Sequence, residues 1–293
     1  MKKLLAIAVA AGLAAPMAVM ADTTLYGKMK VSVGSNKNAA GDSVTTVEAH
    51  SSRIGVKGST PMDNGMSITH KVEFSTKNAI DNSTGGTAAL GARDAWVGMK
   101  GNFGEVRVGR HATPLSLSSD AYDIMNVGGH KSIGNGPFRV SNAIAYLKGF
   151  GPVGFAAAYV PDETHGVNSD VISTLINYSS NGIYTAWGHQ KAKGGTATDT
   201  LTLGYTAPAG HKASLVYNKT GDYKGTALNG RYKFGKAYVQ AEIGKVKDVD
   251  GSYKVGELGY KLGKGTTVWT SLGKNDMAKS KASHARIGIT SNF

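Results

Sequence analysis

The strongest constraint on the fold of this chain is a two-residue alternation of apolar and polar side chains, repeated in segments of about ten residues. In Leu25–Val33 every second residue is apolar or glycine, and Lys28 and Lys30 lie on the opposite face of the segment. Met66–Phe74 and Ala237–Ile243 repeat the pattern. Helical spacing is not sustained anywhere beyond residue 21, so we expect an all-β protein.

The links between these segments alternate between short and long. Short, turn-rich links occur at 63–65, 101–104, 149–152, 181–182, 208–210, 235–236 and 263–265. Longer and more polar links lie at about 36–50, 77–92, 115–141, 163–170, 193–199, 221–225, 248–252 and 276–281. These seven short and eight long links would connect sixteen strands.

Short turns at one end and long loops at the other are typical of transmembrane barrels, whereas a secreted β-sandwich lacks this rhythm. An eight-stranded barrel would be filled by side chains or by one ligand, but sixteen strands enclose an aqueous lumen. We therefore expect a single domain over residues 22–293, a 16-stranded antiparallel transmembrane β-barrel.

The first 21 residues are typical of a secretory signal peptide. Lys2 and Lys3 precede the apolar segment Leu4–Ala15, and small residues before Asp22 suit cleavage after Ala21. The apolar segment is too short for a membrane-spanning helix, which needs about 20 residues. We expect residues 1–21 to be removed on export.

The charge of the chain is strongly basic. With 33 Lys and Arg against 20 Asp and Glu the net charge is +13, and loss of Lys2 and Lys3 leaves +11. Such an excess of positive charge is typical of proteins that bind nucleic acid or an anionic lipid surface, or that provide a path for anions. Nucleic acid is the less favoured partner here, because we expect the chain to be exported. Cysteine is absent, which excludes a disulfide scaffold and thiolate metal sites.

Several segments resemble a known family. Leu25–Lys28, Ser52–Gly58, Arg93–Gly101 and Phe103–Arg110 resemble the first, second, fourth and fifth strands of the general porins of Gram-negative bacteria, and Phe293 resembles their final residue. The resemblance covers the first third of the chain and its terminus. It implies a homotrimer of sixteen-stranded barrels in the cell outer membrane, surrounded by outer-membrane lipids and lipopolysaccharide. Its function would be ion transport and passive diffusion of small hydrophilic solutes.

In such porins the third external loop folds into the barrel and narrows it. Here the longest link, Leu115–Ser141, stands at the third external position, although it lacks the Pro-Glu-Phe-Gly sequence that is frequent there. The resemblance therefore makes Asp120 and Asp123 candidates for the acidic side of a constriction.

The selectivity of a pore depends on its width and on fixed charge at the narrowest point. Alternation with apolar neighbours places Lys28, Arg53, Lys71 and Arg107 on the inward face of their strands. For Arg53 and Arg110, alternation and the resemblance both favour the pore wall. The resemblance places Arg110 facing the inserted loop and assigns Lys28 and Arg53 to the same basic wall. Together with the net charge, these residues predict a channel that prefers anions weakly to moderately.

Two alternatives stay open, namely a channel specific for phosphate or organic anions and, less favoured, an outer-membrane barrel enzyme. No Gly-x-Ser-x-Gly elbow occurs, and the eight histidines have no zinc-site spacing. Gly230–Lys236 has the spacing of a phosphate loop, but Ala237 replaces the Ser or Thr that binds magnesium. We expect no catalytic residue, no cofactor and no metal.

Overall fold

The computed structural model describes residues 22–81, 89–134, 136–162, 170–247, 249, 251–277 and 282–293, without the side chains of residues 131 and 132. The expected signal peptide, residues 1–21, lies outside the described residues, as do parts of five of the long links. The strands are β1 (Asp22–Lys37), β2 (Ser43–Ala49), β3 (Arg53–Pro61), β4 (Ser67–Ser75), β5 (Gly91–Gly101), β6 (Gly104–Ala112), β7 (Arg139–Phe150), β8 (Val153–Val160), β9 (Val171–Ser180), β10 (Ile183–Ala192), β11 (Thr198–Thr206), β12 (Lys212–Thr220), β13 (Tyr223–Phe234), β14 (Ala237–Val246), β15 (Tyr253–Gly263), β16 (Thr266–Asn275) and β17 (Ala282–Asn292). The helical elements are α2 (Lys77–Asp81), α3 (Pro114–Asp120) and the 3-10 turn η1 (His130–Ile133).

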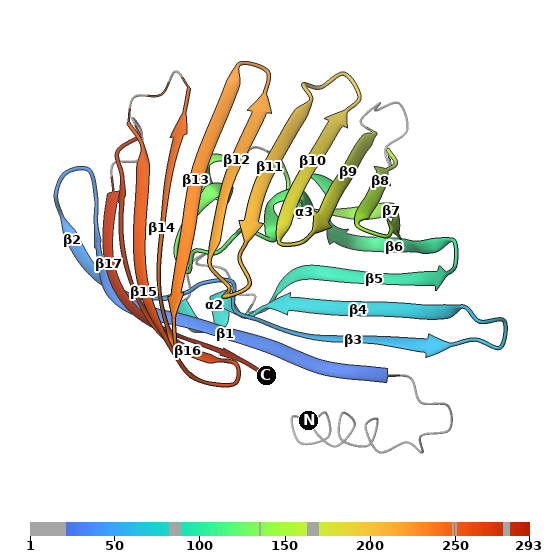
Figure 1. Cartoon of the computed structure of the whole chain (residues 1–293), viewed down its shortest axis with the longest axis horizontal. Helices are drawn as coiled ribbons and strands as arrows, with labels where there is room; N and C mark the ends of the chain where they lie inside the picture. Colours follow the sequence, from blue (N-terminus) through green and yellow to red (C-terminus); the bar gives the residue numbers. More distant parts are fainter. Residues whose placement is uncertain are drawn as a thin grey trace.

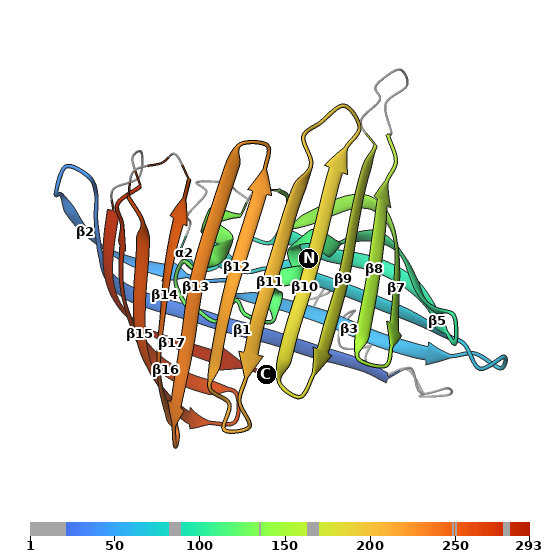
Figure 2. The same cartoon turned by 45° about the horizontal axis from the view of Figure 1, so that its top comes forward.

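Consecutive strands pair antiparallel around one closed sheet (Figures 1 and 2), and β1 pairs with β17 to complete the barrel. Both β2 and β3 pair with β1, on successive parts of its length, so the seventeen segments occupy sixteen positions. The predicted sixteen-stranded barrel is confirmed. The expected link over 36–50 is shorter than predicted, because β1 and β2 form a hairpin joined by residues 38–42.

The interruption between β2 and β3 has a local cause. Ser51 has a φ of 55°, which breaks the extended backbone. Ser52 is fully buried, and its hydroxyl bonds to both the backbone N–H and the carbonyl of Lys30. The side chain of Ser52 therefore replaces a backbone partner of β1 where the strand is broken.

All seven predicted short links are turns at one end of the barrel, and the other links lie at the opposite end. The link predicted to be long over 221–225 is a tight turn instead, because β12 and β13 pair up to Thr220 and Tyr223. Alternation along the strands turns large apolar side chains outward, for example Leu201, Leu203 and Tyr205 on β11, while Thr200 and Thr202 between them face inward and are buried. No helix in the described part of the chain is long and apolar enough to cross a bilayer.

The barrel closes at the carboxyl terminus. Gly27 and Phe293 exchange backbone hydrogen bonds of 2.9 and 3.2 Å. A Cβ atom at Gly27 would lie 2.2 Å from the Phe293 ring, so only glycine lets the ring cover the backbone of β1 there. The terminal aromatic residue is thus part of the β1–β17 seam.

Candidate functional site: the lumen and its inserted loop

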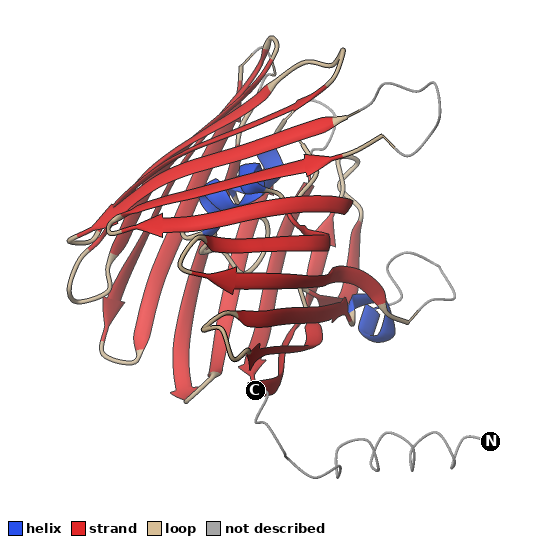
Figure 3. Ribbon diagram, turned by 90° about the vertical axis from the view of Figure 1, so that its right-hand side faces the viewer, coloured by secondary structure: helices blue, strands red, loops and turns tan. Residues whose placement is uncertain are grey.

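Residues 113–138, between β6 and β7, run through the interior of the barrel (Figure 3), where α3 packs against β9, β10 and β11. The helix starts because Thr113 accepts a hydrogen bond from Ser116 N–H and Pro114 occupies its first turn. Leu117 then packs against Ala156, Leu175 and Ala186 of the wall. We call residues 113–138 the inner loop.

The second half of the inner loop packs farther round the barrel. Its buried side chains Ile124, Met125 and Ile133 form a cluster with residues of β13, β14 and β15, namely Ala227, Val246, Tyr253 and Val255. Tyr122 lies over Gly204, where an added Cβ would be 2.2 Å from its ring. Small wall residues therefore make room for the loop.

Glu257 on β15 is the main polar anchor of the inner loop. Its carboxylate accepts hydrogen bonds from the backbone N–H groups of Asn126 and Val127, at 2.9 and 3.0 Å, and from the Asn126 side chain at 2.8 Å. Gln240 Nε2 also donates to Glu257, at 2.5 Å, and to the Ile124 carbonyl at 2.8 Å. A carboxylate that accepts several N–H bonds in a buried site holds the loop strongly.

Other wall side chains donate to backbone carbonyls of the inner loop. These six donors come from four strands, β1, β10, β12 and β13, and reach acceptors spread along the loop: Tyr184 to Ser118, Lys212 to Ala121, Asn229 to Tyr122, Arg231 to Ile124, Lys30 to Asn126, and Tyr223 to Ile133. We call the lumenal faces of β8–β15, which carry most of these contacts, the seating wall.

The opposite side of the lumen is basic. The inward ionisable side chains of β1 and β3–β7 comprise nine cations, Lys28, Lys30, Arg53, Lys57, Lys71, Arg93, Lys100, Arg107 and Arg139, and four carboxylates, Asp22, Glu73, Asp94 and Glu105. We call this face the basic wall. Its excess of five positive charges faces a lumen whose low-dielectric wall concentrates the field.

Two buried carboxylates organise the centre of the basic wall. Glu73 lies 2.5 Å from Arg93 and 3.5 Å from Arg53, and it also accepts a hydrogen bond from Tyr26. Asp94 pairs with Lys71 at 2.5 Å and with Arg139 at 2.7 Å. The two acids hold four guanidinium or ammonium groups against the wall, and the cluster keeps two net positive charges.

Sequence reasoning did not select Glu73, Asp94, Arg93 or Arg139 as site residues. The signal for the two acids was present, because both share the inward alternation of Lys71. Arg93 stands at the register shift between β4 and β5, and Arg139 begins β7 after the inner loop, so alternation alone does not predict their direction.

The structure brings four of the seven predicted site residues onto the basic wall. Lys28, Arg53 and Lys71 lie on neighbouring strands β1, β3 and β4. Arg107 lies on β6, where its guanidinium stacks 4.1 Å from the centroid of the Trp96 ring and pairs with Glu105 at 2.7 Å.

Arg110 does not lie on the basic wall with the other four predicted cations. It lies opposite Ala95 in the register, on the alternation of outward Val108, and its Nη1 donates to Ser141 at 2.9 Å. Asp120 ends α3, and Asp123 follows in the inner loop; both side chains are exposed.

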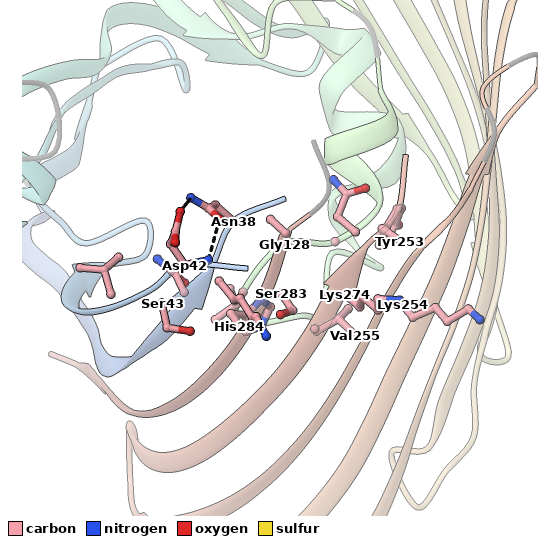
Figure 4. Close-up of a pocket in the computed structure, with 18 residues that line it drawn as sticks. Asn38, Asp42, Ser43, Gly128, Tyr253, Lys254, Val255, Lys274, Ser283 and His284 are labelled. Atoms are coloured by element: carbon pink, nitrogen blue, oxygen red, sulfur yellow. Dashed lines mark hydrogen bonds between the residues drawn. The ribbon is translucent and has the colours of Figure 1, made fainter. Parts of the chain in front are cut away.

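The mouth of the pore has its own cavity of about 540 Å³, between the β1–β2 hairpin, the inner loop and β15–β17. Figure 4 shows Asn38 and Asp42 on one side of it and Gly128 and Tyr253 on the other. Asn38 and Asp42 are joined by two hydrogen bonds that involve their side chains and by one between their backbones, and these close the hairpin. Among the described residues, no group of three or more His, Asp or Glu side chains could hold a metal ion.

This closed barrel with a loop seated inside it agrees with comparison to known proteins. The family model of Gram-negative porins matches residues 6–279. The chain belongs to the Gram-negative porin family. This porin is 30% identical over 284 residues to outer membrane porin protein 32 of Delftia acidovorans, with 84% of this chain and 78% of that protein covered.

Other relatives agree. Major outer membrane protein P.IB of Neisseria sicca is 33% identical over 130 residues, which cover 42% of this porin and 34% of the relative. The solved anion-selective porin from Comamonas acidovorans has a TM-score of 0.72 at 22% identity, with 94% of this chain and 100% of that chain covered. Salmonella typhi OmpF reaches a TM-score of 0.78 at 15% identity over 92% of this chain and 97% of that chain.

These findings confirm the predicted family, the barrel fold and the outer-membrane location. The relatives are channel proteins rather than enzymes.

Proposed function

We propose that this porin is a diffusion channel for small hydrophilic solutes that prefers anions. The observation that carries the proposal is the excess of five positive charges on the basic wall, on the side of the lumen that the seating of the inner loop leaves uncovered. The name of the Comamonas acidovorans neighbour, an anion-selective porin, supports the same direction.

Lys28, Arg53, Lys71 and Arg107 are the proposed selectivity residues, and Asp120 and Asp123 on the inner loop are the proposed acidic side. Salt at about 0.1 M screens charges beyond about 10 Å, so these residues act on ions only where the passage is narrow. The inner loop produces that narrowing.

The test is the reversal potential of single channels in planar bilayers under a potassium chloride gradient. We expect anion preference in the wild type and a shift toward cations in the double variant Lys28→Ser/Arg53→Ser. Arg110→Ser removes the same type of charge from an outward position and serves as the control, with an unchanged reversal potential. Cation preference in the wild type, or equal shifts in both variants, would refute the proposed selectivity residues.

Single-channel recordings at increasing phosphate concentration separate a general pore from an anion-specific one. Current that rises linearly with phosphate concentration supports general diffusion, and saturation by one anion supports a specific channel.

We also propose that the porin is a homotrimer in contact with lipopolysaccharide. Membership in the porin family supports both statements. Conductance steps that occur in threes, and a native mass of three chains, would test the trimer.

A further inference from the structure

Five outward-facing lysines form a row along one edge of the barrel surface. Each is the second residue from the loop end of its strand, and the five strands are neighbours (Figure 1): Lys219 on β12, Lys224 on β13, Lys245 on β14, Lys254 on β15 and Lys274 on β16. The long-loop end of a porin is external. We call this set the lysine row.

The register shows that the lysine row faces outward. Lys254 is exposed and lies opposite Ile243, an exposed apolar residue, whereas its neighbours Tyr253 and Val255 are buried inside. In Figure 4 the Lys254 side chain extends away from Asn38 and Asp42 of the pore mouth. The side chains of these lysines therefore do not line the lumen.

The arrangement brings like charges face to face. Lys219 lies directly opposite Lys224, and Lys254 directly opposite Lys274. Cross-strand pairs of like charge destabilise a sheet unless an anion neutralises them. Lys274 pairs with Asp276 at 2.9 Å, but this pair is largely exposed and contributes little.

One carboxylate on the same face is already occupied. Asp199 lies opposite Lys219 in the register, yet its Oδ1 accepts hydrogen bonds from Trp187 at 3.1 Å and His189 at 2.8 Å.

Below the lysine row the outer surface has an apolar hollow of about 800 Å³. Four small residues lie side by side in the register across β12–β15, namely Ala213, Gly230, Ala241 and Gly256. Leu228, Ile243 and Leu272 form its exposed apolar sides, and Lys254 and Lys274 line its upper edge.

Gly256, one of the glycines that line the hollow, is not required there by the packing of neighbouring atoms. A Cβ atom at Gly256 would meet nothing within 4 Å, and the residue has no positive φ. A glycine in a strand costs stability, and its occurrence marks close approach of another group.

We propose that the lysine row and the hollow beneath it bind lipopolysaccharide, with its phosphates on Lys254 and Lys274 and one acyl chain in the hollow. The inference rests on, and locates, the lipopolysaccharide contact proposed above. Ammonium groups suit phosphate oxygens, and a hollow between outward apolar side chains suits an acyl chain. A zwitterionic phospholipid could place an acyl chain in the hollow, but it would not neutralise the lysine row.

The test is native mass spectrometry of the folded porin in detergent, titrated with purified lipid A that carries both phosphates. We expect Lys254→Gln/Lys274→Gln to weaken binding roughly thirtyfold. Lys236→Gln/Lys264→Gln removes the same charge at the opposite, turn end and should bind as the wild type does. Gly256→Leu fills the hollow where space is open, and it should weaken binding of lipid A without affecting folding.

Three results would overturn the proposal. The first is equal loss in both double variants, which would indicate a general effect of charge. The second is equally tight binding of phosphatidylethanolamine, or displacement of lipid A by millimolar inorganic phosphate. The third is a change in the number of chains per particle in Lys254→Gln/Lys274→Gln, which would make this face an interface between copies of the chain. Conductance and reversal potential of these variants should match the wild type, so failure of the channel proposal would be recognised separately.

Discussion

Strands β8–β15 and strands β1–β7 share the same alternation, but they direct different chemistry into the lumen. The seating wall presents small apolar residues and acceptors such as Glu257, and the inner loop covers it. The basic wall presents cations in excess and stays uncovered by the loop's apolar clusters. In the proposed channel, one half of the strands holds the loop that narrows the lumen, and the other half supplies the fixed charge that sets ion selectivity.

The most severe disruption of this contrast is expected from Glu257→Leu. It leaves the N–H groups of Asn126 and Val127 without their acceptor, at about 1–3 kcal/mol each, so the loop should leave its seat. Single-channel conductance and the size of the largest permeating polyethylene glycol should both rise. Glu105→Gln removes a carboxylate from the basic wall and should leave the polymer cutoff unchanged; an equal rise there would contradict the role of Glu257.

A second variant tests whether the stability of the barrel that carries both walls depends on the seam between β1 and β17. Gly27→Val places a side chain where the Phe293 ring lies and should destabilise the barrel by about 1–3 kcal/mol. The unfolding temperature on gels of unboiled samples should fall. Gly149→Ala, at a site with no atom within 4 Å, is the control, and equal thermal shifts would argue against a specific seam.

Trp96→Leu isolates packing from charge on the basic wall. The variant removes the ring on which Arg107 stacks, a contact of about 0.5–1 kcal/mol, but it leaves the cation in place. A small loss of thermal stability with unchanged ion selectivity is expected. A large shift of the reversal potential would mean that the position of Arg107, and not its charge alone, sets selectivity.

The smallest expected effect comes from Glu73→Gln. One unit charge at about 10 Å in water corresponds to about 0.4 kcal/mol, or roughly a twofold change in the anion-to-cation permeability ratio. The ratio should increase, because Arg53 and Arg93 lose a counter-charge. Glu242→Gln removes a carboxylate from the seating wall, and comparison of its permeability ratio with that of Glu73→Gln shows whether position on the basic wall matters. A decrease of the anion-to-cation permeability ratio in Glu73→Gln would contradict the electrostatic argument.

The sequence was sufficient to predict the barrel because strand alternation and turn residues are local signals. All seven turns and the inward direction of Lys28, Arg53, Lys71 and Arg107 depend only on neighbouring residues. The register shift between β6 and β7 near Gly109 does not. Arg110, for which alternation and resemblance both favour the pore wall, lies at that shift and opposite Ala95.

The position of the inner loop in the lumen could not be predicted from local patterns, because it depends on contacts between segments that are far apart in the sequence. Asn126 and Glu257 are separated by 131 positions in the chain, and no pattern in either segment indicates that they meet. Glu73 and Asp94, by contrast, could have been selected, since their alternation was visible beside Lys71.

The long separation between Asn126 and Glu257 also has a consequence for assembly. Contacts between distant segments close large loops of chain and form late during folding. A barrel in which β15 has not yet docked lacks the carboxylate that holds Asn126 and Val127. We therefore expect the inner loop to take its seat in the lumen only after β15 has docked beside its neighbouring strands.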